Sequence, residues 1–150
     1  MRRNANLGLH YLDNKAYATI NARKHIRTMP KKIVIIEDES SISQMYKFKL
    51  DAEGYDVAIA QDSWSGLKLI EKMKPDLVLL DVLMPYETGD GTLLKLRATP
   101  YGKNLKVIMM TNTEPQDAAP IIKKLAIRGY IIKADTTPKQ LATIVKEELS

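Results

Sequence analysis

The sequence predicts an α/β protein with a doubly wound, five-stranded parallel sheet. Two observations lead to this prediction: short apolar runs recur five times between residues 33 and 132, and a stretch of helical periodicity follows each run. Strands that alternate with helices pair in parallel through right-handed crossovers, because each helix packs back onto the sheet. Five such units in residues 33–150 are expected to form a three-layer sandwich with helices on both faces.

Five apolar runs are the expected strands, and most consist of consecutive apolar residues, as in strands buried on both faces of a parallel sheet. They cover residues 33–36, 55–60, 77–80, 105–110 and 130–132. The third run lies between Pro75 and Pro85 and ends at Asp81. A charged residue at the end of a buried strand stands at the rim of the sheet, although Asp81 taken alone could simply begin a turn.

Five segments with helical periodicity and capping signals are the expected helices. They cover residues 40–53, 62–74, 89–99, 115–127 and 136–149. Ser40 or Ser41 is the expected cap of the first helix, and Gly54 the glycine that ends it. The apolar stripe of that helix is predicted at Ile42, Met45, Phe48 (or Lys49) and Leu50. Trp64 is expected on the outer side of the second helix, where it contacts a partner or packs at the edge of the domain.

The positive charge of the chain lies almost entirely at its N-terminus. Residues 1–32 contain eight basic residues and one acidic residue, a net charge of +7, whereas residues 33–150 contain 15 basic and 17 acidic residues, a net charge of −2. A mildly acidic body is unlike a nucleic-acid-binding domain. We expect residues 31–150 to form the domain and residues 1–30 to be a basic, poorly ordered extension. A frayed helix, an arm that contacts an anionic partner, and residues upstream of a start at Met29 are the alternatives for the extension.

The composition excludes several kinds of site. The chain has no cysteine, so it forms neither a disulfide framework nor a thiolate metal site, and a reducing, cytoplasmic compartment is compatible with it. Its two histidines, His10 and His25, both precede the first strand, which excludes a histidine-based zinc or catalytic site in the body. No apolar run approaches the roughly 18 residues needed to span a bilayer.

The residues that follow the expected strands form a chemical pattern. After the first, third, fourth and fifth strands come, in order, Glu37 with Asp38, Asp81, Thr111 and Lys133. Parallel strands bring their carboxyl ends to one edge of the sheet, where ligands bind in such folds. Clustered carboxylates without histidine or cysteine favour Mg²⁺, and a hydroxyl with an ammonium group favours a phosphoryl oxyanion. The strand ends therefore predict a site that binds Mg²⁺ and a phosphoryl group.

With these residues in this order, the sequence resembles the receiver domain of two-component response regulators over residues 31–149. That family has a flavodoxin-like (βα)5 fold, so the resemblance implies the same fold here. It also implies that Asp81, in the segment 79–85, accepts a phosphoryl group as the nucleophile. The Mg²⁺ ligands implied by the resemblance are Glu37, Asp38, Asp81 and the backbone carbonyl of Leu83.

The resemblance extends to the residues that respond to phosphorylation. By similarity, Thr111 is the switch hydroxyl that moves toward the phosphoryl group, Lys133 pairs with that group, and Tyr130 is the aromatic whose rotamer reports the switch. Three positions depart from the family pattern: Glu37 stands where aspartate is commoner, Ala134 where a cis-proline is usual, and Pro120 is unusual near the start of the fourth helix. Because a cis bond before a non-proline residue costs about 2.5–4 kcal/mol, the bond after Lys133 is predicted to be trans, or its loop to be relaxed.

The implied function is that of a stand-alone phosphoacceptor rather than an enzyme. A sensor histidine kinase or histidine phosphotransfer protein would donate the phosphoryl group, an unknown downstream protein would bind the switched surface, and no output domain or membrane span is expected. Nucleic acid is kept as a partner only through the basic N-terminal tail. A Mg²⁺-dependent phosphatase is the enzymatic alternative, but such enzymes place a second acid two residues after the nucleophile, where this chain has Leu83.

Overall fold

The structure is a computed structural model that describes residues 28–112 and 124–150. The predicted helix at 115–127 and the predicted N-terminal extension lie mostly outside these residues. The other predicted helices and all the predicted strands fall inside them, together with every residue predicted to form the site.

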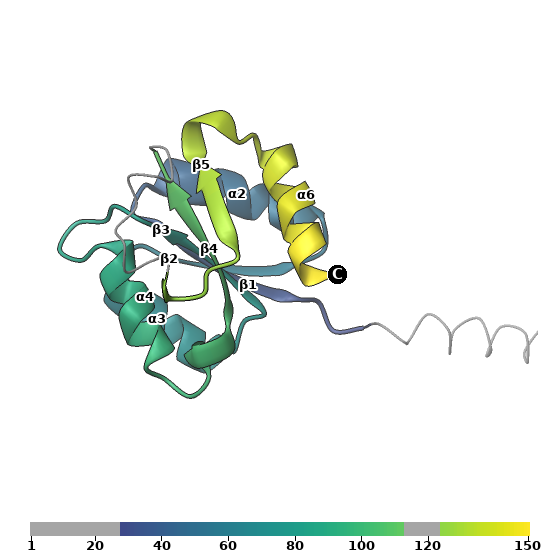
Figure 1. The fold of residues 1–150 in the computed structure, drawn as a ribbon. Helices are drawn as coiled ribbons and strands as arrows, with labels where there is room; N and C mark the ends of the chain where they lie inside the picture. The colour runs from purple at the N-terminus through teal and green to yellow at the C-terminus, as the bar shows by residue number, and fades with distance from the viewer. Residues whose placement is uncertain (1–27, 113–123) are drawn as a thin grey trace, which may run out of the picture. The chain divides into compact units, whose positions relative to one another are not determined.

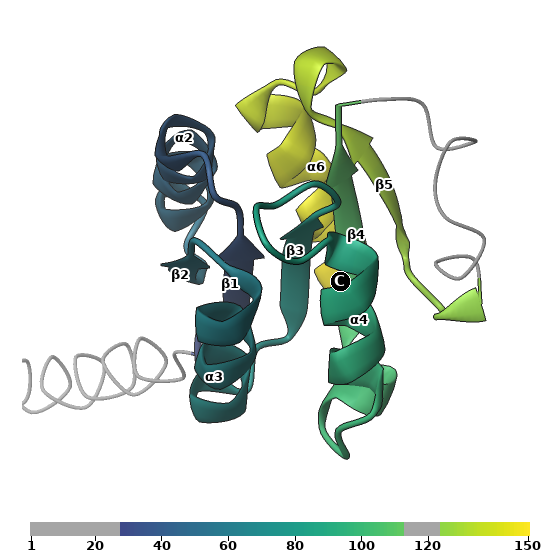
Figure 2. The same cartoon turned by 90° about the vertical axis from the view of Figure 1, so that its left-hand side faces the viewer.

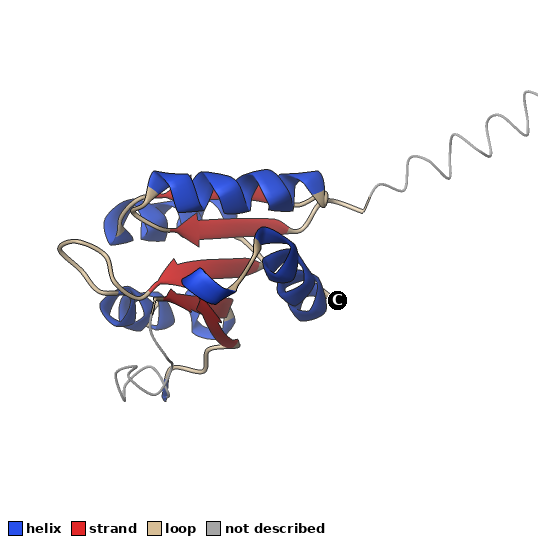
Figure 3. Cartoon of the chain, turned by 90° about the horizontal axis from the view of Figure 1, so that it is seen from above, coloured by secondary structure: helices blue, strands red, loops and turns tan. Residues whose placement is uncertain are grey.

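In the described part of the chain, five parallel strands form one sheet (Figure 1). They are β1 (Lys32–Ile36), β2 (Asp56–Ala60), β3 (Leu77–Asp81), β4 (Lys106–Thr111) and β5 (Gly129–Ile132). Their order across the sheet is β2-β1-β3-β4-β5, and Figure 3 shows the strand arrows pointing the same way. All five predicted strands are confirmed, and their order reverses direction between β1 and β3. A switch point of this kind leaves a crevice at the carboxyl ends of the two strands.

Helices cover both faces of the sheet. They are α2 (Ser40–Ala52), α3 (Ser63–Met73), α4 (Gly89–Arg97) and α6 (Pro138–Leu149), with short 3-10 turns η1 (Gly102–Asn104) and η3 (Lys133–Asp135). Figure 2 shows α2 and α6 on one face of the sheet and α3 and α4 on the other, as the two hydrophobic cores require. None of the described helices is both long and apolar enough to cross a membrane.

Alternate residues of the central strands contribute to two separate hydrophobic cores. In β1, Ile33 and Ile35 pack into the core that contains side chains of α2 and α6, whereas Val34 and Ile36 pack into the core that contains side chains of α3 and α4. All four side chains are fully buried. If the pairing of a strand shifted by one residue, the side chains of its two faces would exchange cores. Burial of both faces therefore fixes the strand register, and with it the residue that ends each strand. The positions of the site residues follow from this register.

Helix caps agree with the sequence in α3 and α6 and disagree in α2. Asp62 caps α3 and Thr137 caps α6, each by accepting a hydrogen bond from a backbone N–H three residues later. The prediction for α2 is wrong, because the N-cap residue is Glu39 rather than Ser40 or Ser41. Ser40 is already the first helical residue, so the cap falls on the residue before it.

The predicted apolar stripe of α2 is also partly wrong. Met45 and Phe48 are 43% and 80% exposed, whereas Tyr46 is completely buried. The face of α2 that packs on the sheet follows Ile42, Tyr46 and Leu50, spaced four residues apart. A tyrosine side chain carries enough apolar surface to occupy a core position. In α2 the core position belongs to Tyr46, although Met45 and Phe48 are more apolar.

Candidate functional site

The carboxyl ends of β1 and β3 place two acidic residues side by side. Ile36 pairs with Leu80 in the parallel register, so the next residues along each strand, Glu37 and Asp81, are neighbours. Glu37 is 0% exposed and Asp81 is 2% exposed. These two buried acids stand at the switch point of the sheet, which is where folds of this kind bind their ligands.

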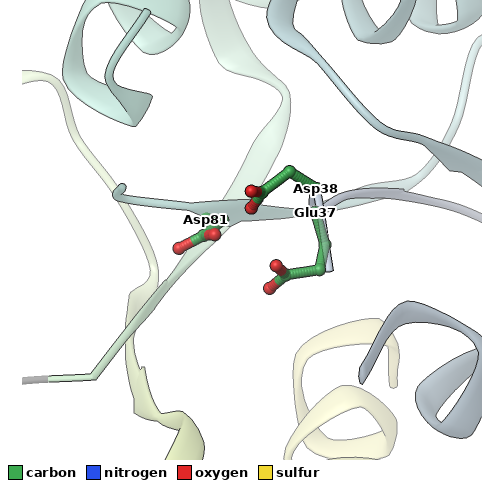
Figure 4. A group of neighbouring side chains, drawn as sticks. All are labelled: Glu37, Asp38 and Asp81. Carbon is green, nitrogen blue, oxygen red and sulfur yellow. The ribbon is translucent and has the colours of Figure 1, made fainter. Parts of the chain in front are cut away.

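A third carboxylate completes an acidic cluster at this rim. Asp38 directly follows Glu37 and is exposed, and one oxygen from each of Glu37, Asp38 and Asp81 lies within 4.8 Å of the others. Figure 4 shows the three side chains directed toward a common space from the ends of the two strands. The structure therefore brings together the three carboxylates that the sequence singled out.

Lys133 provides the counter-charge of the two buried acids. It is the first residue of η3, directly after β5, and its Nζ donates a hydrogen bond to Glu37 Oε2 at 3.0 Å. The same Nζ lies 3.3 Å from Asp81 Oδ2, which accepts no hydrogen bond from the described residues. The Lys133 side chain is only 6% exposed, so water screens these charges little. No peptide bond in the described segments is cis, which confirms the trans bond predicted between Lys133 and Ala134.

The pKa values of Glu37, Asp81 and Lys133 are all raised. Burial raises the pKa of Glu37 from 4.5 to about 7, although the Glu39 N–H and the Lys133 ammonium act in the opposite direction. Burial also raises the pKa of Asp81, again against the effect of Lys133. The pKa of Lys133 is raised, because its interactions with the two acids outweigh the effect of burial, which alone would lower it. Two buried acids thus share one buried cation.

Backbone N–H groups hold one oxygen of each buried carboxylate. Glu39 donates to Glu37 Oε1 at 3.0 Å, and Leu83 donates to Asp81 Oδ1 at 3.2 Å. These bonds orient the two side chains and leave Glu37 Oε2 and Asp81 Oδ2 directed toward Lys133. The Leu83 carbonyl is a predicted metal ligand, and the hydrogen bond from the Leu83 N–H holds its loop against Asp81.

Gly89 brings the first residue of α4 close to the end of β3. Its N–H donates to the carbonyl of Val82 at 2.8 Å. A Cβ atom at this position would lie 2.2 Å from the backbone oxygen of Asp81 and 2.9 Å from Val82 Cα, closer than any real contact. Only glycine therefore allows the loop after Asp81 to close against the strand.

Thr111 and Tyr130 lie on the neighbouring strands. Thr111 is the last residue of β4, is 5% exposed, and follows Met110, which pairs with Asp81 across the sheet. Tyr130 lies two positions before the end of β5 and packs against the core on the α3 and α4 face. Its hydroxyl is buried, which raises its pKa, and has no hydrogen-bond partner among the described residues. Thr111 is thus part of the rim, whereas Tyr130 lies below it.

The acidic cluster fits a hard divalent cation. All its side-chain donors are carboxylate oxygens, and the domain contains neither histidine nor cysteine. Asp38 is exposed, so water can reach the cluster, and Mg²⁺ in proteins usually keeps several waters. Each of the three acids offers one carboxylate oxygen within 4.8 Å of the others. The residues present therefore suit Mg²⁺.

Two features of the rim were not predicted from the sequence. Tyr46 is fully buried near the site, and burial raises the pKa of its hydroxyl, with smaller effects from the charges of Lys133 and Glu37. The four-residue spacing of Ile42, Tyr46 and Leu50 was the signal that could have identified it. The hydrogen bond between Lys133 and Glu37 was missed as well, because spacing along the chain does not say which of two acids a lysine approaches.

The fold and the rim together define a class of protein: a parallel α/β domain with a cluster of carboxylates at the switch point of its sheet. A family model described as the response regulator receiver domain matches residues 33–146. The chain therefore belongs to the response regulator receiver domain family, whose members are modules of two-component signalling.

Solved structures of similar proteins agree with this assignment. The chemotaxis response regulator CheY4 of Vibrio cholerae is 25% identical, with a TM-score of 0.73 over 79% of this chain and 98% of that one. A CheY-like receiver domain protein from Methanospirillum hungatei JF-1 is 30% identical, with a TM-score of 0.73 over 80% of this chain and 94% of that one. The predicted flavodoxin-like (βα)5 fold and the predicted family are confirmed.

Proposed function

We propose that this domain accepts a phosphoryl group on Asp81 and changes a protein-binding surface in response. The observation that supports the proposal most directly is the placement of Asp81. It ends the central strand β3, clusters with Glu37 and Asp38, and points Oδ2 at Lys133 from 3.3 Å. A carboxylate nucleophile needs an available oxygen and nearby positive charge, and this arrangement offers both.

Transfer to Asp81 exchanges one bond to phosphorus for another. Oδ2 attacks the phosphorus atom, and the bond between phosphorus and the donor's histidine nitrogen breaks. The nitrogen recovers the bonding electrons, and an acyl phosphate forms on Asp81. Because the N–H of Leu83 holds Oδ1, the attacking oxygen is already oriented, and positioning of this kind supplies much of the rate in phosphoryl transfer.

The metal partner proposed for the site is Mg²⁺. Glu37, Asp38 and Asp81 would hold it through their carboxylates, and Leu83 through its backbone carbonyl. When bound, the ion supplies positive charge that neutralises the oxygens of the transferring group. Glu37 in place of aspartate reaches one methylene further into this cluster, and its buried carboxylate has to be deprotonated to act as a ligand.

The proposed switch uses side chains that already border Asp81. Lys133 lies within reach of both acids, so a small rotation carries its ammonium from Glu37 toward a phosphoryl group on Asp81. Thr111, at the rim end of β4, turns its hydroxyl toward the same oxygens. Tyr130 then repacks beside β4, and the surface around β5 and α6 changes with it. This is a shift between two populated states, so the unphosphorylated protein also samples the switched one.

The partners proposed for the domain follow from this chemistry. The phosphoryl donor is a sensor histidine kinase or a histidine phosphotransfer protein, and the output is the binding of a downstream protein target in the cytoplasm. Residues 31–150 act as the receiver domain. The extension at 1–30 is basic, so any contact with an anionic partner such as nucleic acid is assigned to that segment.

Incubation with acetyl phosphate and Mg²⁺, followed by intact-mass spectrometry, tests the proposal. The wild-type protein is expected to gain one phosphoryl group, Asp81→Ala none, and EDTA to abolish the gain. Asp56→Ala is the matched control, because Asp56 is an exposed aspartate at the opposite end of the sheet. Uptake of phosphate by Asp81→Ala would contradict the assignment of the nucleophile, and uptake that persists in EDTA would contradict the role of the metal.

A further inference from the structure

A groove with a cavity volume of about 520 Å³ lies between α3 and the end of α4. Its floor contains the apolar side chains Leu67, Ile70 and Leu96, and the aromatic rings of Trp64 and Tyr101 border it. The volume is in the range of about 300–1,000 Å³ that is typical of ligand-binding pockets. Its lining residues lie outside the cluster of Glu37, Asp38 and Asp81, and the phosphorylation chemistry uses none of them.

Trp64, the only tryptophan of the chain, is the most prominent residue of this groove. It is 68% exposed, which confirms the prediction that it points outward from the second helix. Tryptophan is among the residues most enriched in protein interfaces, because it offers a large apolar surface at little cost in side-chain entropy. An exposed tryptophan next to an apolar floor is therefore well placed to contact a partner.

The border of the groove is positively charged. It carries Lys68, Lys74 and Lys95 against one acidic residue, Glu71. Lys95 already forms an ion pair with Glu87 at 2.6 Å. Lys68 and Lys74 form no ion pair with any described residue. Their Nζ atoms lie 3.7 Å from the centre of the Trp64 ring and 4.7 Å from that of Tyr101, contacts that position a positive charge without neutralising it.

The residues that line the groove on the α3 side extend from the start of the helix to the residue after its end. Trp64 and Lys68 lie on α3 and Lys74 directly follows its last residue, so the lining runs the length of this 11-residue helix, which spans about 15 Å at 1.5 Å per residue. That length corresponds to about three turns of a second helix. An amphipathic helix laid into such a groove would place apolar side chains on Leu67 and Leu96 and its own charges beside the lysines.

We propose that this groove binds an acidic, amphipathic peptide segment of a partner protein. The apolar side chains of the segment occupy the floor, and its carboxylates pair with Lys68 and Lys74. The N-terminal extension does not match the groove in charge, because residues 1–32 carry a net charge of +7. A nucleic acid is disfavoured because the apolar floor of Leu67, Ile70 and Leu96 offers nothing to a phosphate backbone.

Peptide selection tests the chemistry of the occupant. Random peptides of about 15 residues, displayed on phage, are selected on the wild-type protein and counter-selected on the double variant Lys68→Glu/Lys74→Glu. Enriched sequences are expected to be net negative, with apolar residues spaced three and four apart. Enrichment of basic or uncharged sequences, or no enrichment that depends on the two lysines, overturns the proposal.

The affinity of a synthetic copy of the enriched peptide is then measured from the change in Trp64 fluorescence on binding. The double variant Lys68→Glu/Lys74→Glu is expected to weaken binding by at least about tenfold, whereas Lys72→Glu changes it by less than about twofold. Lys72 is the matched control, because it is exposed on the same helix but does not border the groove. Equal weakening in both variants would show that only overall charge matters and would overturn the proposal.

Two further measurements separate the other occupants. A single-stranded oligonucleotide that binds the groove as tightly as the peptide, and is displaced by it, overturns the proposal in favour of nucleic acid. Dimerisation in sedimentation experiments that Lys68→Glu/Lys74→Glu abolishes overturns it in favour of a second copy of the chain. Thermal melting by circular dichroism confirms that each variant is folded, and both lysines are exposed, so their replacement is expected to leave the fold intact.

Discussion

The carboxyl rim of the sheet and the groove between α3 and α4 both gather charged side chains, but in opposite environments. At the rim the Lys133 side chain is 6% exposed and Glu37 is 0% exposed. In the groove Lys68 and Lys74 are exposed and lie beside aromatic rings. Buried charges have lost their hydration and need partners, whereas exposed charges keep it. Changes at the rim should therefore alter folding stability, and changes of the exposed lysines of the groove should alter binding alone.

The two regions also differ in how the chain builds them. The rim is formed by residues that directly follow strands, so the strand register alone brings Glu37 beside Asp81. The groove is formed by side chains of two helices and of the turn after α4, and their meeting depends on how those helices pack. Among the described residues, Lys68 and Lys74 of the groove have no ion-pair partner, whereas the buried acids of the rim have their counter-charge in Lys133.

The largest expected effect is that of Lys133→Met. The substitution leaves Glu37 and Asp81 buried together without a cation, and loss of one partner from a buried ion pair costs about 3–5 kcal/mol. We expect the free energy of unfolding to fall by about 4 kcal/mol at a pH above the Glu37 pKa, measured by urea denaturation. Lys31→Met is the control, because Lys31 pairs with Asp76 at the surface at 3.6 Å and should contribute at most about 1 kcal/mol. Equal losses in the two variants would mean that the buried pair is not coupled to folding.

The second prediction concerns the pH dependence of stability in metal-free buffer. The pKa of Glu37 is raised from 4.5 to about 7 in the folded protein, so between these values the folded state binds more protons than the unfolded state. Stability should therefore decrease as the pH rises from 4.5 to 7, by an amount on the order of 3 kcal/mol, and this contribution should be constant above 7. Glu37→Gln should remove most of this slope in urea denaturation at a series of pH values. If the pH dependence of stability were unchanged in Glu37→Gln, it would have to come from groups other than Glu37.

Most of the fold could be predicted from the sequence, because buried parallel strands appear as apolar runs and their order along the chain restricts how they can pair. The acidic cluster could be predicted for the same reason, since its residues are fixed at strand ends. The α2 face could not be predicted from hydrophobicity alone. Phe48 is the more apolar residue, yet Tyr46 has the helical position that faces the sheet.

Contacts between elements that are distant in sequence were beyond the sequence analysis. Trp64 was recognised as an outward residue, but nothing in the sequence indicated that Tyr101 would border the same groove. The same is true of Arg97, which donates hydrogen bonds to the carbonyls of Gly102, Leu105 and Leu125 and so ties α4 to the residues before β5. Such contacts depend on side-chain reach and helix packing, neither of which has a fixed spacing along the chain.

A third prediction compares two glycines of α4 at the edge of the rim. Gly89→Ala would place a Cβ against the backbone of Asp81 and Val82, which cannot yield easily, so the free energy of unfolding should fall by about 2 kcal/mol. Gly91→Ala would meet only the Glu87 side chain, 3.2 Å away, and alanine is the better helix former. Gly91→Ala should therefore be neutral or stabilising by about 0.5 kcal/mol in the same denaturation experiment. A similar loss for both variants would contradict the assignment of the cost to the contact between Gly89 and the end of β3.

The smallest expected effect is that of Trp64→Ala on stability. Because the side chain is 68% exposed, its removal should change the free energy of unfolding by less than about 0.5 kcal/mol. Tyr46→Ala, which empties a fully buried position beside the rim, should cost about 3–5 kcal/mol. Far-UV circular dichroism is the appropriate measurement, because Trp64→Ala removes the only tryptophan. A loss above about 1 kcal/mol for Trp64→Ala would mean that the Trp64 ring itself stabilises the fold, and its exposure would then need no partner to explain it.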